Sequence, residues 1–138
     1  MNAVKVLYLT YVDLASPAKS GSALRPQKML EALREISGEL RVVDGKQNDY
    51  HARKNACAKV RTWLRDWTPD LCYIEPPSGP LFFECDRALL RLIHRKRIPI
   101  GIFYRDAYWR FPEAVGSSEK GLKSALKRRL IVFMQKRV

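Results

Sequence analysis

The chain has 138 residues, of which 46% are hydrophobic and 29% are charged, and its formal net charge is +12. These values are typical of a globular domain with its own core, and no apolar run approaches the roughly 20 residues of a membrane-spanning helix. The cysteines Cys57, Cys72 and Cys85 form no C-x-x-C pair, so we expect neither a disulfide framework nor a zinc site. Three free thiols fit a reducing compartment, which predicts a cytoplasmic protein.

The first third of the chain predicts a strand, a helix and a second strand. Residues 4–10 form a short apolar run, as expected of a central parallel strand that is buried on both faces. A loop rich in small residues follows over 11–24. Pro26 is then expected in the first turn of a helix, where its missing N–H costs nothing. That helix ends at Gly38, and residues 40–43 predict the second strand.

The middle of the chain repeats this alternation. A turn at 44–45 and a polar stretch precede an amphipathic helix, whose apolar side chains Val60, Trp63, Leu64 and Trp67 recur at helical spacing. We interpret the two tryptophans as packing residues. Residues 68–70 break the helix, and a third strand is predicted over 71–75, where two prolines stop it.

The last part of the chain predicts another helix and strand, and then a final helix. Leu89, Leu90 and Ile93 mark a third helix, which ends in the basic run 94–97. A fourth strand is predicted over 98–104, followed by an aromatic, charged loop over 105–116. Ser117 or Ser118 is expected to cap the final helix.

Strands and helices therefore alternate, with crossovers long enough to hold a helix. This order predicts the α/β class, with a doubly wound parallel sheet in three layers (α/β/α). We place the sheet domain in residues 1–116 and a basic amphipathic helix in residues 117–138.

The final helix carries a concentration of positive charge. Seven of the 26 Lys and Arg residues lie between Glu119 and Val138. Lys123, Lys127 and Arg128 share the polar side, Arg129 adds to the charge, and residues 130–134 are apolar all round. An apolar helix surface of this kind is normally buried, so we expect the helix to continue beyond Val138 into a larger protein or to lie on an anionic membrane surface. The basic residues alone also fit a solvated helix face.

Two of the candidate site segments follow the first and third strands. In open α/β sheets, ligands bind at the carboxyl ends of the strands. The small-residue loop places Gly21 and Ser22 before the helix, where backbone amides meet a phosphate or a sugar hydroxyl. Arg25 is positioned to bind phosphate with two hydrogen bonds. Glu75 closes the third strand and is a candidate acceptor for sugar hydroxyls, although it also fits a simple turn.

The loop after the fourth strand is the third candidate. It holds Arg105 and Asp106, and then Tyr108 and Trp109. Aromatic rings stack on sugar faces, while Arg and carboxylate groups bind phosphates and hydroxyls. Asp106 is the candidate catalytic residue, as a general base or as the group that orients an acceptor hydroxyl. The alternative is a purely structural role, in which an ion pair between Arg105 and Asp106 stabilises the loop.

Other chemistries find little support in the sequence. The first loop has only one glycine, so the G-x-G-x-x-G pattern of a dinucleotide site is missing. His51 and His94 stand alone, and no cluster of metal ligands is recognisable by spacing. We therefore expect no metal and no resident cofactor.

Taken together, these segments resemble the N-terminal domain of GT-B fold glycosyltransferases. The similarity is to the retaining, family-4-like group that builds cell-surface polysaccharides and glycolipids, and it spans nearly the whole chain with loose motifs. The segments that carry it are Lys5-Val-Leu-Tyr-Leu, the Gly21 loop, Arg25-Pro26 with Leu30 and Leu33, Leu71–Glu75, and Ile100-Gly-Ile-Phe-Tyr-Arg-Asp106 followed by a basic helix.

The resemblance implies that this chain is the truncated N-terminal half of a GT-B fold, a Rossmann-like domain that binds the acceptor. A C-terminal domain with an E-x7-E motif would bind the nucleotide-sugar, which is a donor substrate, and this half alone would be inactive. The resemblance assigns a close backbone approach to Gly21 and a place at the reaction centre to Asp106, where the family commonly has His. It also implies a glycan or lipid-linked acceptor, a metal-free reaction, and peripheral attachment to the inner membrane face, with no nucleic-acid partner.

A second hypothesis remains open. The chain also fits a non-catalytic basic α/β module that binds an anionic partner, either a membrane surface or nucleic acid. This interpretation predicts binding that weakens steeply with salt and depends on the lysines and arginines of the final helix, not on Asp106.

Overall fold

The computed structural model describes residues 3–77 and 83–103. Their centre is a four-stranded sheet in the order β2-β1-β3-β4, and all neighbouring strands are parallel. The strands are β1 (Lys5–Thr10), β2 (Glu39–Val43), β3 (Leu71–Glu75) and β4 (Ile100–Ile102). The predicted parallel α/β sheet is thus confirmed for the described part of the chain.

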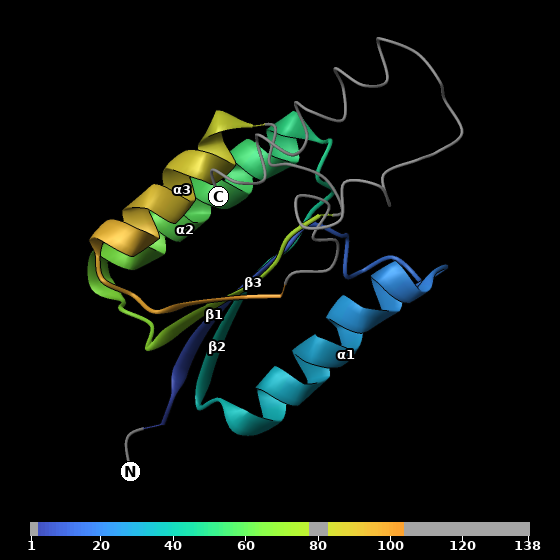
Figure 1. Ribbon diagram of the computed structural model, residues 1–138, viewed down its shortest axis with the longest axis horizontal. Helices are drawn as coiled ribbons and strands as arrows, with labels where there is room; N and C mark the ends of the chain where they lie inside the picture. The colour runs from blue at the N-terminus through green and yellow to red at the C-terminus, as the bar shows by residue number, and fades with distance from the viewer. Residues whose placement is uncertain (1–2, 78–82, 104–138) are drawn as a thin grey trace, which may run out of the picture.

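Three helices cover the two faces of this sheet. They are α1 (Gly21–Ile36), α2 (Tyr50–Asp66) and α3 (Glu84–Arg95). Helix α1 lies against one face, while α2 and α3 pack side by side against the other (Figure 1). The chain leaves β1 in one direction to form β2 and returns to the other side to form β3. The reversal between β1 and β3 is the position at which open α/β sheets bind ligands.

The alternation of side chains along β1 builds two cores. Val6 and Tyr8 point toward α1 and pack with Leu33. Leu7 and Leu9 point the other way, into the larger core formed with α2 and α3. Because β1 is buried on both faces, it reads as a continuous apolar run rather than an alternating one.

Two helices begin earlier than the sequence pattern predicts. Helix α1 begins at Gly21, so Pro26 lies in its second turn and not at its start. Helix α2 begins at Tyr50, ten residues before the first apolar side chain of the predicted pattern, and Asp49 caps it by accepting a hydrogen bond from the amide of Ala52. The loop after β1 is correspondingly shorter than predicted.

The predicted loop over 105–116 and the predicted final helix lie outside the described residues. The predicted division of the chain after residue 116 is therefore not tested. Within residues 3–77 and 83–103, each helix is too short or too polar to cross a bilayer.

Candidate binding pocket at the carboxyl edge of the sheet

A pocket of about 370 Å³ opens where β1 and β3 end. It therefore lies at the reversal of strand order. Four segments line it: the end of β1 with the loop that follows, the first turns of α1, the loop after β2, and the end of β3. The lining residues are Thr10, Tyr11, Val12, Asp13, Ser16, Pro17, Ala23, Pro26, Lys46, Gln47, Asn48, Glu75, Pro76 and Pro77.

The loop after β1 is held in place by its own hydrogen bonds. The Asp13 carboxylate accepts from the Ser16 hydroxyl at 2.6 Å and from the Ala15 amide at 3.0 Å. These two hydrogen bonds, the Ser16 one first, hold the pKa of the Asp13 carboxyl below its ordinary value. The carboxylate is therefore ionised at neutral pH and offers its remaining lone pairs to the pocket.

Hydrogen bonds to α1 and to the loop after β2 also hold this loop in place. The Gln27 side chain of α1 donates to the Ser16 carbonyl at 3.0 Å, and the Leu14 amide donates to the Asp44 carboxylate at 3.0 Å. The Gly45 amide donates to the Val12 carbonyl at 2.9 Å. One wall of the pocket is thus largely formed before any ligand arrives, which lowers the entropic cost of binding.

Arg25 and Glu75, both predicted as site residues, lie together at this edge. Arg25 Nε is 3.5 Å from Glu75 Oε2, and the guanidinium stacks 3.3 Å from the ring centre of Phe103 at the end of β4. The Glu75 side chain is only 6% exposed, whereas that of Arg25 is 38% exposed. Arg25 therefore neutralises a nearly buried carboxylate of the pocket, and any phosphate it binds has to share it with Glu75.

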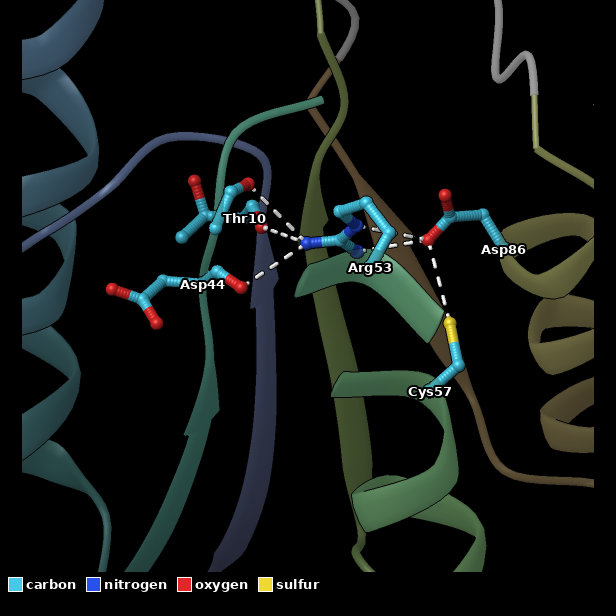
Figure 2. Close-up of polar contacts among 6 residues, drawn as sticks. Thr10, Asp44, Arg53, Cys57 and Asp86 are labelled. Carbon is cyan, nitrogen blue, oxygen red and sulfur yellow. Dashed lines mark hydrogen bonds and ion pairs between the residues drawn. The ribbon is translucent and has the colours of Figure 1, made fainter. Parts of the chain in front are cut away.

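Behind the pocket, Arg53 joins both sides of the carboxyl edge. Its Nη1 donates to the carbonyl of Thr10, the last residue of β1, at 3.1 Å. It also donates to the carbonyls of Asp44 and Gly45, the two residues after β2, at 3.2 and 3.4 Å (Figure 2). Its Nε and Nη2 donate to Asp86 Oδ1 of α3 at 3.2 and 2.9 Å. Arg53 is fully buried, so its charge is matched inside the fold, and it fixes the strand ends from which the pocket is built.

The remaining predicted residues divide into two groups. Gly21 is the first residue of α1, and a Cβ built on it would meet nothing within 4 Å. The described residues therefore do not require glycine at that position, and Ser22 follows it in the helix. The other predicted residues lie outside the described part of the chain: Arg105, Asp106, Tyr108, Trp109, Lys123, Lys127, Arg128 and Arg129.

Several residues that line the pocket were not predicted from the sequence. Asp13 and Ser16 lie in the loop that was assigned only as a segment, and Lys46 and Asn48 belong to the polar stretch after β2. Their common signal is position, because each lies in a loop that follows the carboxyl end of a strand of the parallel sheet, either β1 or β2. Cys57, Cys85 and Asp86, which no sequence spacing relates, come together between α2 and α3 and could hold a metal ion, so the expectation that the protein binds no metal stays a prediction.

A scan against models of protein families, a search of curated proteins and a search of solved structures each gave no match to this chain.

Proposed function

We propose that this chain is the acceptor-binding half of a retaining GT-B glycosyltransferase, whose pocket at the β1–β3 edge holds a sugar of a glycan or lipid-linked acceptor. The single observation that carries the proposal is the position and lining of that pocket. It lies at the reversal of strand order, where the loops after β1 and β2 and the end of β3 supply polar side chains, while α1 contributes Ala23 and Pro26. The resemblance of these sequence segments to GT-B glycosyltransferases suggests that the ligand at this position is a sugar acceptor.

The lining suits a polyhydroxylated ligand. The carboxylates of Asp13 and Glu75 accept hydrogen bonds from hydroxyl groups, and the side chains of Lys46, Gln47 and Asn48 donate them. Acceptors and donors in one pocket match a sugar ring, because its hydroxyls both donate and accept hydrogen bonds. The ion pair with Arg25, at 3.5 Å, helps to orient the Glu75 carboxylate in this arrangement.

Under this proposal, transfer requires a donor domain that presents the nucleotide-sugar to the acceptor, because the reaction needs both substrates held in one geometry. Asp106, which lies outside the described residues, keeps its two proposed roles, either as general base or as the group that orients the acceptor hydroxyl. Binding of the acceptor is the part of the function that the described residues would carry themselves, so binding is the property to test first.

The test is a titration of the isotope-labelled chain with a panel of octyl glycosides, which combine one sugar with a lipid-like tail. We expect saturable shifts of the backbone amide signals of Ser16 and Asn48 with at least one sugar. The variant Glu75→Gln should weaken that binding by roughly tenfold, because a hydrogen bond to a charged group is lost. Asn55→Ala, on the exposed face of α2, is the control and should bind as the wild type does.

Two results would count against the proposal. The first is that no glycoside of the panel shifts the backbone amide signals of Ser16 and Asn48. The second is a response to anionic vesicles or duplex DNA that salt abolishes while the glycosides do nothing. That outcome favours the anionic-partner hypothesis, because electrostatic binding of this kind falls steeply with ionic strength.

A further inference from the structure

Two cysteines and an aspartate meet where α2 packs against α3. Cys57 comes from α2, while Cys85 and Asp86 are neighbours in the first turn of α3. One sulfur or oxygen atom from each of the three residues lies within 4.8 Å of the other two. Cys57 and Asp86 are buried and Cys85 is partly exposed. Cys57, Cys85 and Asp86 are not among the described residues that line the proposed sugar pocket.

We propose that Cys57, Cys85 and Asp86 form a binding site for a thiophilic divalent cation such as Zn²⁺. Two thiolates and one carboxylate are a donor set that such a cation prefers over Mg²⁺ or Ca²⁺. In a tetrahedral zinc site with bonds of about 2.3 Å to sulfur, the ligand atoms lie about 3.7 Å apart. The distances between the three ligand atoms, at most 4.8 Å, therefore need to shorten by no more than about 1 Å around the ion.

The hydrogen bonds of Asp86 support this assignment. Arg53 donates to Asp86 Oδ1 through Nε and Nη2, which fixes the orientation of the carboxylate (Figure 2). An outer partner of this kind is the usual support of a metal ligand. Cys57 Sγ is 3.5 Å from the same oxygen, so the thiol already points at the carboxylate with which it would share the ion.

The charges balance in both states of the site. Without the ion, the two thiols are neutral and the Arg53–Asp86 pair cancels. On binding, each thiol releases its proton to solvent, and two thiolates with one carboxylate carry three negative charges. The divalent cation and the Arg53 guanidinium supply three positive charges. The buried cluster therefore gains no net charge when the ion enters, which removes the main penalty for placing it there.

The exposure of Cys85 gives the ion a route from solvent. Three protein ligands leave a fourth position, which a water molecule fills in open zinc sites. Because the ligands come from two helices, bound metal would also hold α2 against α3 and so raise the stability of the fold by mass action.

The test is a titration of the reduced chain with Cd²⁺, read by thiolate-to-metal charge-transfer absorption, and with Zn²⁺, read by thermal unfolding. We expect one Cd²⁺ bound through two thiolates, and a rise of Tm with Zn²⁺. Cys85→Ser should lose more than the roughly 10–100-fold in affinity that removal of an outer partner costs. Cys72→Ser is the matched control, because this third cysteine is buried in β3 outside the cluster.

Cys57→Ser should lose binding as well, and if that variant fails to fold, Cys85→Ser decides alone because its side chain is partly exposed. Three results would overturn the proposal: Cys85→Ser binds Cd²⁺ as tightly as the wild type, Cys72→Ser loses the signal, or the folded wild-type chain shows no charge-transfer band at equimolar Cd²⁺. Glycoside binding at the pocket is measured separately, so neither proposal depends on the other.

Discussion

Arg25 of α1 and Glu75 at the end of β3 form an ion pair of 3.5 Å across the carboxyl edge of the sheet. The two residues are 50 positions apart in the chain, and the fold brings them together because β3 pairs beside β1 while α1 crosses the same face. Phe103, from the end of β4, covers the guanidinium. Three elements thus converge on one nearly buried carboxylate.

We expect Arg25→Ala to lower the free energy of unfolding by about 1–3 kcal/mol, because it removes the countercharge of a nearly buried carboxylate. Lys28→Ala is the control on the same helix. Its ion pair with Glu31 is well exposed, at 65% and 58%, so its loss should change stability by less than about 0.5 kcal/mol. Urea denaturation measures both. Equal costs for the two variants would contradict the structural importance of the Arg25–Glu75 pair.

The second prediction concerns the buried pair Arg53–Asp86. We expect Arg53→Met to cost about 3–5 kcal/mol, because it strands a buried carboxylate and three carbonyls. Asp86→Asn should cost less, because the amide oxygen still accepts a hydrogen bond. A double-mutant cycle by denaturant unfolding should give a coupling of about 0.5–3 kcal/mol. Additive costs would mean that the two side chains do not interact as described.

The third prediction concerns alkaline pH. Burial raises the pKa of the Cys72 thiol from 9.0 to about 12, and burial also raises the pKa values of Tyr8 and Tyr11. Between the ordinary pKa of each group and its raised value in the fold, the unfolded chain loses a proton that the folded chain keeps. The free energy of unfolding therefore falls as pH rises. The slope is about 1.4 kcal/mol per pH unit for each such group.

Denaturation midpoints between pH 8 and pH 11 check this expectation. Cys72→Ala removes one of the titrating groups, so its stability should fall less steeply above pH 9 than that of the wild type, whatever its stability at pH 7. Parallel curves for the two proteins would show that Cys72 does not keep its proton in the folded state.

The fourth prediction separates two glycines. Gly45 has a φ of +118° and its amide donates to the Val12 carbonyl at the pocket wall. We expect Gly45→Ala to cost at least about 1 kcal/mol, because a side chain strains this backbone. Gly21 begins a helix beside open space, so Gly21→Ala should stabilise by up to about 1 kcal/mol. Thermal unfolding of the two variants is sufficient, and a neutral Gly45→Ala would contradict the assigned backbone geometry.

The strands were predictable because their signal is local. The range 71–75 was predicted to the residue, and β1 begins one residue later than the predicted run. Both strands are buried on two faces, so their apolar runs stand out from the polar segments beside them. The parallel arrangement followed from the helices between them, since parallel strands need long crossovers.

The early start of α2 was missed because the predicted apolar pattern began at Val60 and left out Cys57 and Arg53. Arg53, Cys57, Val60 and Leu64 are the buried positions of this helix and recur at helical spacing. A hydrophobic pattern counts Arg53 as polar and so cuts the helix short. Its burial depends on Asp86, 33 residues further on, and no local rule relates these positions.

The candidate site was predicted as an edge of the sheet and not as a set of contacts. Glu75 and Arg25 were identified because each belongs to a strand end or a helix start. Their pairing, and the entry of Asp13 and Asn48 into the same pocket, depend on the order of the strands. The meeting of Cys57 with Cys85 likewise depends on how α2 packs against α3, because neither residue has a ligand partner at a recognisable spacing.

The most direct test of the proposed function is the dissociation constant of the best octyl glycoside for the wild-type chain and for Asp13→Asn. Asp13 lines the pocket and its carboxylate is exposed to solvent, so the substitution changes the charge without opening the core. We predict saturable binding to the wild type and a loss of roughly tenfold in the variant, because a charged hydrogen-bond acceptor becomes neutral. Equal dissociation constants for the two proteins, or no binding to either, would contradict the assignment of this pocket to a sugar acceptor.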